Sequence, residues 1–311
     1  MRGGNIRIDI SITKAVTRPR HIVPGDTYLI TRRCFARHFF LRPSEFTNQV
    51  VLYCLAVAAS RFDTLIHQFS VMSNHYHIVL TGNLPAFMQY LNEFVAKTMN
   101  AHLGRWECFF APGSYSAVKL TDEQSALEKM VYSITNPVDA GLVSQSSAWP
   151  GICTLPRDIG TSLTVKRPDK LFRKEGPMPE EATLTLAPLP AALNNSPETQ
   201  IAELGELVAQ KEAALREQLK DDGRCFLGRR AVLKQDPFGT PQSREPRRGL
   251  NPRVAGRDRE RRREALAQIK AFLADYREAW LKFRDGIRDV VFPHGTYALR
   301  LHQGVCCGPG S

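Results

Sequence analysis

The stretch "TLIHQFSVMSNHYHIVLTG" constrains the fold more than any other part of this sequence. Two apolar runs rich in β-branched and aromatic residues flank Ser73 and Asn74, and such polar pairs are typical of tight turns. We therefore expect an antiparallel hairpin. A hairpin is stable only within a larger sheet that has a packed face. A further strand is predicted for "TYLITRR", over residues 27–33.

Three helices are predicted around these strands. Ser44 is a good N-cap for a helix that runs through "NQVVLYCLAVAAS", and a second helix begins after Pro85. In the third, Thr121 and Gln124 form a capping-box pattern, and Pro137 should end the helix near Asn136. Strands and helices in this order predict an α+β domain over residues 1–155, with an antiparallel sheet and helices on one face.

The rest of the chain differs in composition. Repeated prolines predict a linker over residues 156–195, and residues 196–311 are predicted to be basic and mainly helical. Ser196 and Pro197 are expected to start a helix that reaches about Lys220. A later helix has an apolar heptad seam, which predicts packing within the chain or with a second copy in a homodimer. The seam consists of Leu266, Ile269, Leu273, Tyr276, Trp280, Phe283 and Ile287.

The charge balance favours a polyanionic partner. The net charge is +11 with a pI near 9.5, and residues 224–263 hold thirteen Lys or Arg against four acidic residues. Nucleic acid is the commonest such partner, and an anionic membrane is the alternative. The basic stretch is expected to contact nucleic acid, although a flexible solubilising segment would have the same composition.

Two further features of the sequence indicate the cellular compartment and the redox state of the cysteines. The sequence has no run of about 18 apolar residues, and its first residues lack the apolar core of a signal peptide, so we expect a cytoplasmic protein. Seven Cys occur without C-x-x-C spacing, which indicates neither a disulfide framework nor a structural zinc site.

His75 and His77 stand one residue apart in the second strand of the predicted hairpin. Alternate side chains of a strand point to the same face, so the two imidazoles are placed to chelate a metal ion. The alternative is a strand whose polar face carries two histidines with no ligand. A metal site therefore needs further ligands from elsewhere in the chain.

The third helix offers such partners. At 100° per residue, Tyr132 lies roughly 150° from the centre of the apolar stripe of this helix, and Asn136 lies about 40° from Tyr132. If this face meets the sheet edge that carries His75 and His77, two imidazoles and an amide oxygen would hold a divalent cation beside a phenol. The alternatives are an ordinary surface tyrosine and an Asn-Pro pair that only terminates the helix.

This set of groups suits phosphodiester chemistry. A phenol is a weak nucleophile at neutral pH, but a phosphodiester polarised by a metal ion is an adequate electrophile. The resulting phosphotyrosine keeps the bond energy needed to rejoin a strand, so DNA is the natural substrate.

The segments "MSNHYHIVL", "YSITNPVDAGLV" and "SSAWPG" together resemble the single-tyrosine HUH transposases, most closely the REP-associated tyrosine transposases, over residues 18–152. The resemblance implies a ferredoxin-like fold similar to an RNA-recognition motif. It also implies Mg²⁺ or Mn²⁺ bound by His75 and His77, with Asn136 as a third ligand and Tyr132 as the nucleophile. Such enzymes cleave single-stranded or hairpin DNA, leaving a 5′-phosphotyrosine and a free 3′-hydroxyl.

The sequence thus predicts a metal-dependent DNA transposase or nickase. Candidate contacts to the DNA backbone are Arg32, Arg33, Arg37, Lys97 and Arg105, although cations of this kind also occur on plain solvated faces. Two other functions stay open. One is a domesticated hairpin-DNA binding protein without strand transfer, and the other is an RNA-binding module of the same fold class.

Overall fold

The computed structural model describes residues 19–113, 115–170, 172–173, 175–190, 196–243 and 252–308. The chain divides into a larger unit, Ile22–Ala271, and a smaller one formed by Met1–His21 and Phe272–Ser311. The helix α6 (Arg259–Arg284) contributes its first part to the larger unit and its last part to the smaller one. The predicted domain boundaries at residues 155 and 195 stay a prediction.

A five-stranded sheet forms the centre of the larger unit, in the order β2-β3-β1-β4-β7. The first four strands pair antiparallel, and the short β7 pairs parallel to β4. The strands are β1 (Thr27–Arg33), β2 (Leu65–Val71), β3 (His75–Thr81), β4 (Ser116–Leu120) and β7 (Val254–Ala255). The helix α1 (Glu45–Arg61) connects β1 to β2, and α2 (Leu84–His102) connects β3 to β4. The expected α+β, ferredoxin-like arrangement is therefore confirmed.

Local signals place these elements where the sequence predicts them. The strand β1 covers the predicted residues, and Ser73 and Asn74 form the hairpin turn, closed by a bond from Met72 N to His75 O of 2.8 Å. Ser44 caps α1, because its backbone is extended and its Oγ accepts from Thr47 N at 3.0 Å. The predicted hairpin and first helix are thus confirmed.

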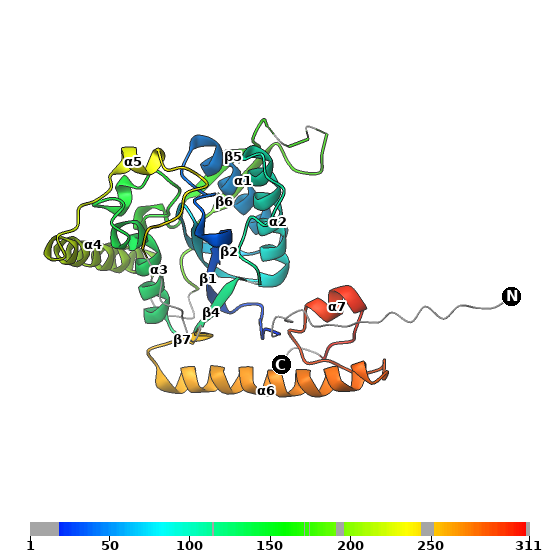
Figure 1. Ribbon diagram of the computed structural model, residues 1–311. Coiled ribbons are helices and arrows are strands. Elements are labelled where there is room, and N and C mark those ends of the chain that lie inside the picture. The colour runs from blue at the N-terminus through cyan, green and yellow to red at the C-terminus, as the bar shows by residue number, and fades with distance from the viewer. Residues whose placement is uncertain are drawn as a thin grey trace. The chain divides into compact units, whose positions relative to one another are not determined.

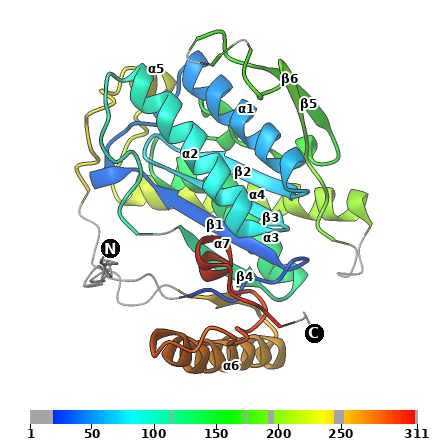
Figure 2. The same ribbon diagram turned by 90° about the vertical axis from the view of Figure 1, so that its right-hand side faces the viewer.

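Helices cover both faces of the sheet (Figures 1 and 2). Tyr28 and Ile30 of β1 pack with α1 and α2 on one face, as predicted. Leu29, between them, packs on the other face with α3 (Glu123–Asp139) and α4 (Pro197–Asp221). The sequence predicted the helices on one face, but α3 and α4 form a second layer on the other face, and this layer carries Tyr132.

The ends of α3 differ from the prediction. Asp122 rather than Thr121 is the N-cap, with its Oδ1 accepting from Ser125 N at 2.7 Å. The helix also continues through Pro137 to Asp139 instead of stopping at Asn136. Proline lacks the N–H that would bond to the Ser133 carbonyl, but Pro137 and Val138 are buried, so packing outweighs the lost bond.

A hairpin lies where the sequence predicted a Pro-rich linker. The strands β5 (Ser162–Lys166) and β6 (Glu181–Thr185) pair antiparallel, after the short 3₁₀ helix η3 (Pro156–Asp158). Val165, Ala182 and Leu184 point inward to the core of α1 and α2. The alternating apolar residues of these two short strands therefore attach this proline-containing segment to the core.

The downstream elements are mainly helical, as predicted. Ser196 caps α4, which has buried leucines along one side, and α5 (Arg229–Leu233) follows. Within the basic stretch, residues 244–251 lie outside the described residues. Of the predicted seam, Leu266, Trp280 and Ile287 are exposed, so a homodimer through it stays a prediction.

The smaller unit has its own apolar cluster. Ala279 of α6 packs with Phe292 and Val305, and a bridge joins Phe292 to Cys307 on either side of α7 (Ala298–Gln303). Over the whole described part of the chain, none of the helices combines the length and the apolar character needed to cross a bilayer.

Candidate active site

The two histidines lie side by side on the α3 face of the sheet. In the register of β1 and β3, His77 is opposite Thr31 and His75 is opposite Arg33. The imidazole centroids of His75 and His77 are 4.9 Å apart, and only 3% of His77 is exposed. The alternation of β3 therefore presents both rings to the same space, while Tyr76 between them packs into the core on the other face.

Tyr132 reaches the same space from α3. Its ring centroid is 5.3 Å from that of His77, with the planes inclined at 69°. Tyr132 is 40% exposed, so its phenol is accessible from solvent. Asn136, one turn further along the helix, is only 8% exposed. Tyr132 on α3 thus lies against His77, whereas helical spacing alone predicted only that Tyr132 and Asn136 share a face of the helix.

Oxygen atoms of two neighbouring residues engage the Nδ1 atoms of both histidines. Thr31 Oγ1 lies 2.8 Å from His77 Nδ1, and Asn74 Oδ1 lies 2.7 Å from His75 Nδ1. Metal-binding histidines in proteins are commonly oriented by such a bond at the second ring nitrogen. A metal ion at this site would then bind the Nε2 atom of each ring.

The donor set fits a divalent cation with mixed nitrogen and oxygen ligands. Among the residues that the structure describes, no group of three or more His, Cys, Asp or Glu gathers as a metal site. Two imidazoles and one amide oxygen would supply only three ligands. A cation held in this way would keep its other coordination positions for water and substrate. We keep His75, His77 and Asn136 as a ligand hypothesis on this basis.

A nearby thiol is not a competing nucleophile. Cys153 Sγ approaches the carbonyl of Ile134 on α3 at 4.0 Å, and Cys153 pairs with Ser70 at the edge of β2. Burial raises the pKa of the Cys153 thiol to about 12. The thiol therefore stays protonated at neutral pH, and the nucleophile in reach of the histidines is the phenol of Tyr132.

Of the five predicted cations, Arg33 shares a face with the histidines, because it is paired with His75 in the sheet. Arg32 points to the other face, where its guanidinium lies 5.2 Å from the Phe110 ring centre and donates to Gly113 O. Arg37 donates to Ser243 O at 2.8 Å, and Arg105 stacks on Phe40 at 3.9 Å. DNA contacts by these residues stay a prediction.

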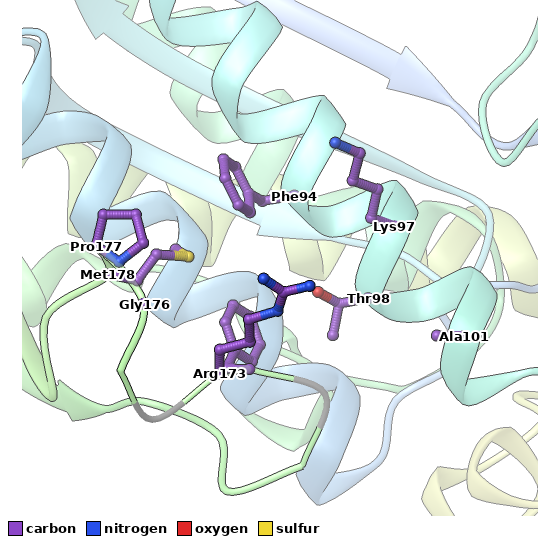
Figure 3. A pocket seen from close by; sticks show the side chains of 9 residues that line it. Phe94, Lys97, Thr98, Ala101, Arg173, Gly176, Pro177 and Met178 are labelled. Carbon is purple, nitrogen blue, oxygen red and sulfur yellow. The ribbon is translucent and has the colours of Figure 1, made fainter.

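Lys97 lies on α2, in the layer on the opposite face of the sheet. It forms an ion pair with Glu93 and lines a cavity of about 280 Å³ (Figure 3). Phe94 and Met178 make much of this cavity apolar, and Arg173 lies across from Lys97. The cavity is separated by the sheet from the histidine pair, so Lys97 and Tyr132 do not belong to one site.

Two solved transposase structures resemble this chain. One is a REP-associated tyrosine transposase bound to a REP hairpin, at 19% identity and a TM-score of 0.38, covering 45% of this chain and 82% of that one. The other is a candidate transposase from Deinococcus radiodurans R1, at 20% identity and a TM-score of 0.27, covering 33% of this chain and 85% of that one. No protein-family model and no curated protein matches the sequence. At these TM-scores neither likeness carries an argument about function.

Sequence reasoning missed Thr31 and Asn74 as neighbours of the histidines. Thr31 gave no signal, because its place opposite His77 depends on the register of two strands that are separated by residues 34–74. The sequence identified Asn74 only as a turn residue. Asn74 directly precedes His75 and its amide both donates and accepts hydrogen bonds, which indicates a candidate partner for the imidazole.

Proposed function

We propose that this chain is a transposase-like DNA endonuclease and strand transferase that cleaves single-stranded or hairpin DNA through Tyr132. The observation that carries the proposal is the approach of the Tyr132 ring to His77, on a sheet face where His75 and His77 lie side by side. An exposed phenol beside a pair of buried or half-buried imidazoles is a nucleophile placed next to a candidate metal site.

The proposed reaction is a transesterification. Tyr132 Oη forms a bond to the phosphorus of the scissile phosphodiester, and the bond from phosphorus to the 3′ oxygen breaks. The phenolic proton leaves Tyr132, and the net product gains a proton at the 3′ oxygen. A 5′-phosphotyrosine and a free 3′-hydroxyl result, and attack by another 3′-hydroxyl reverses the step. The number of phosphodiester bonds is conserved, so no external energy source is required.

His75, His77 and Asn136 would hold Mg²⁺ or Mn²⁺. Bound there, the cation would neutralise charge on the scissile phosphate and orient its oxygen atoms. Arg33, paired with His75, is placed to contact the phosphate backbone beside the site. His77 is buried, whereas the exposure of Tyr132 leaves an approach for an extended strand.

The test is covalent capture. We expect Tyr132→Phe to lose adduct formation completely, because the substitution removes only the nucleophilic oxygen. A labelled single-stranded library rich in hairpins is incubated with Mn²⁺ or with chelator, then analysed by denaturing gel and peptide mass spectrometry. A metal-dependent adduct on Tyr132, absent from Tyr132→Phe and His75→Ala, supports the proposal.

Tyr90→Phe is the matched control, because Tyr90 lies on α2 in the layer on the other face of the sheet. It should form the adduct as the unchanged protein does. Tight hairpin binding with no adduct under any metal would instead favour a DNA-binding protein without strand transfer. Equal or better binding to RNA of the same sequence, unaffected by Tyr132→Phe, would favour an RNA-binding module.

A further inference from the structure

An unusual backbone turn lies beside the histidine hairpin. In the 3₁₀ helix η1 (Phe35–Arg37), Ala36 and Arg37 have φ values of 48° and 64°. Two successive non-glycine residues in the left-handed region are strained, and such strain persists only where surrounding contacts over-determine the backbone. Cys34 N donates to Asn74 O at 2.8 Å, which fixes the start of this turn against the turn of the hairpin.

The strained turn directs the carbonyl of Arg37 toward Asn74. Asn74 Nδ2 donates to this carbonyl at 3.3 Å, and Asn74 Oδ1 lies 2.7 Å from His75 Nδ1. A carbonyl oxygen only accepts, so the amide must place its NH₂ group on Arg37 and its oxygen on His75. The orientation of the Asn74 amide thus follows from its partners.

This orientation determines the protonation of His75. The amide oxygen of Asn74 also only accepts, so His75 Nδ1 must carry a proton to form the bond. In a neutral imidazole the lone pair is then on Nε2. His77 differs, because its Nδ1 faces the hydroxyl of Thr31, which either donates or accepts. The geometry therefore assigns the tautomer of His75 and leaves that of His77 open.

A distant segment of the chain holds the strained turn. Between Gln235 and Ser243, Gly239 O accepts from Phe39 N at 3.0 Å, and Ser243 O accepts from the Arg37 guanidinium at 2.8 Å. On the other side, Ser73 Oγ donates to Gln235 Oε1 at 2.8 Å. This 235–243 segment thus contacts both turns that position Asn74.

We infer that Asn74 is a positioning residue that holds His75 as the Nδ1–H tautomer and so presents Nε2 as a metal ligand. The left-handed turn at Ala36 and Arg37 and the 235–243 segment hold Asn74 in place. The role of this tautomer rests on the proposed function, because a bound metal ion would use the Nε2 lone pair. Its structural content, the tautomer of His75, is measurable whether or not the protein cleaves DNA.

The first measurement is of the unchanged, metal-free protein. The full chain is labelled with ¹⁵N-histidine, and two-bond ¹⁵N–¹H correlation spectra are recorded at a pH where the imidazoles are neutral, with His75→Gln used for assignment. We expect a protonated Nδ1 and an unprotonated Nε2 for His75. A His75 that carries its proton mainly on Nε2 overturns the inference without recourse to any variant of Asn74.

The second measurement compares variants. Asn74→Ala should shift His75 toward the Nε2–H tautomer and weaken Mn²⁺ binding about 10- to 100-fold, by titration followed with electron paramagnetic resonance. Asn74→Asp keeps an accepting oxygen and should keep the Nδ1–H tautomer. Asn48→Ala is the matched control, because Asn48 on α1 donates to Pro150 O and should leave both readouts unchanged.

The outcomes separate the two proposals. Unchanged Mn²⁺ affinity in Asn74→Ala, or a tautomer that does not respond, contradicts the positioning role. If the tautomer and Mn²⁺ affinity respond as expected but no Tyr132 adduct forms on any DNA, the positioning role stands and the nuclease proposal fails. A Tyr132 adduct together with an unresponsive His75 would support the nuclease proposal and overturn the positioning role.

Discussion

Tyr132 and His77 lie against each other but differ strongly in their access to solvent. Tyr132 is 40% exposed and His77 only 3% exposed, with the Thr31 hydroxyl at the Nδ1 atom of His77. A nucleophile that meets a large substrate must be reachable, whereas a ligand must be held still. In the proposed function, Tyr132 on α3 would meet the first need and His77 on the interior strand β3 would meet the second.

At the residue scale we predict a specific effect of Thr31→Val. The substitution keeps the volume of the side chain and removes the hydroxyl that contacts His77 Nδ1 at 2.8 Å. Loss of such an orienting bond typically weakens metal binding about 10- to 100-fold. Calorimetric titration with Mn²⁺ should show this loss, and Thr164→Val, on the exposed face of β5, should not. Equal affinities in the two variants would contradict the role of Thr31.

A second prediction at this scale concerns pH. Burial lowers the pKa of His67 below 6.5, and its Nδ1 donates to Ala187 O at 3.0 Å while Nε2 faces Thr81 Oγ1 at 2.9 Å. Below pH 6.5 the unfolded chain binds a proton at His67 that the folded chain does not bind, so acidification favours unfolding. We expect this group to lower the free energy of unfolding by up to about 1.4 kcal/mol per pH unit.

Urea unfolding at several pH values between 7.5 and 5 measures this slope. In His67→Gln the slope should become shallower, because the proton-binding group is absent from both states. The remaining slope reports other titrating groups, among them His102, whose pKa is also lowered by burial. Identical slopes in the two proteins would show that His67 titrates alike when folded and unfolded.

At the element scale, a buried tryptophan helps to hold the segment after α3 against the sheet. Trp149 is buried and donates through Nε1 to Val71 O at 2.9 Å, next to the hairpin turn. Gly151 follows so closely that a Cβ on it would collide with Trp149 Nε1 and lie 3.0 Å from Val71 O. The "SSAWPG" motif therefore has a structural purpose, which is to anchor the end of α3 to the strand before the histidines.

We predict that Gly151→Ala lowers the free energy of unfolding by about 2–4 kcal/mol, from overpacking and the loss of the tryptophan hydrogen bond. Thermal unfolding should show a melting temperature lower by roughly 5–15 °C. Gly205→Ala is the control, because a Cβ there meets no atom within 4 Å and glycine is unfavourable within a helix. This control should be neutral or stabilising, and a similar loss in both variants would contradict the explanation.

Elements were more predictable from the sequence where their signals are local. Ser44 caps α1 and β1 lies where expected, because capping and alternation depend on adjacent residues. The cap of α3 shifted to Asp122 because its carboxylate also accepts from Arg257 N and Asp258 N, more than 130 residues later. The passage of α3 through Pro137 likewise depends on burial that distant residues provide.

The residues of the candidate site also differ in how far the sequence alone predicts them. Tyr132 and the histidine pair followed from helical and strand periodicity, together with the assumption that their faces meet. The contacts of Thr31, the Arg37 carbonyl and the 235–243 segment depend on strand register and on residues about 200 positions apart. A single sequence contains no signal for these pairings. Arg32 and Lys97 lie on the other side of the sheet from the histidine pair, which a charge pattern alone does not predict.

At the scale of the whole molecule, the segments downstream of residue 155 complete the larger unit. Leu204 of α4 packs against α3, Val232 of α5 packs near Trp149, and Leu184 of β6 packs with α1. The layer behind Tyr132 therefore comes from a part of the chain that the family resemblance does not cover.

We predict that a chain of residues 22–271 folds cooperatively, whereas one of residues 22–175 does not, because the second lacks β6, α4 and α5. Circular dichroism during heating and limited proteolysis distinguish the two. The longer fragment should melt within a few degrees of the full chain and keep its Mn²⁺ affinity. A folded and equally stable 22–175 fragment would show that α4 is dispensable.

The position of α4 also orders events during protein synthesis. The hairpin with His75 and His77 has β1 and β4 beside it once β4 is made, and α3 can then pack on the sheet, but α3 gains its packing against α4 only when α4 ends at Asp221. At ~5–20 residues per second, the ribosome needs roughly 5–20 s to make the about 90 residues between Tyr132 and that point. A growing chain thus carries its histidine pair and the tyrosine helix for several seconds before α4 packs against that helix. If Tyr132 acts as proposed, the packing around the nucleophile would thus be completed only late in translation of the chain.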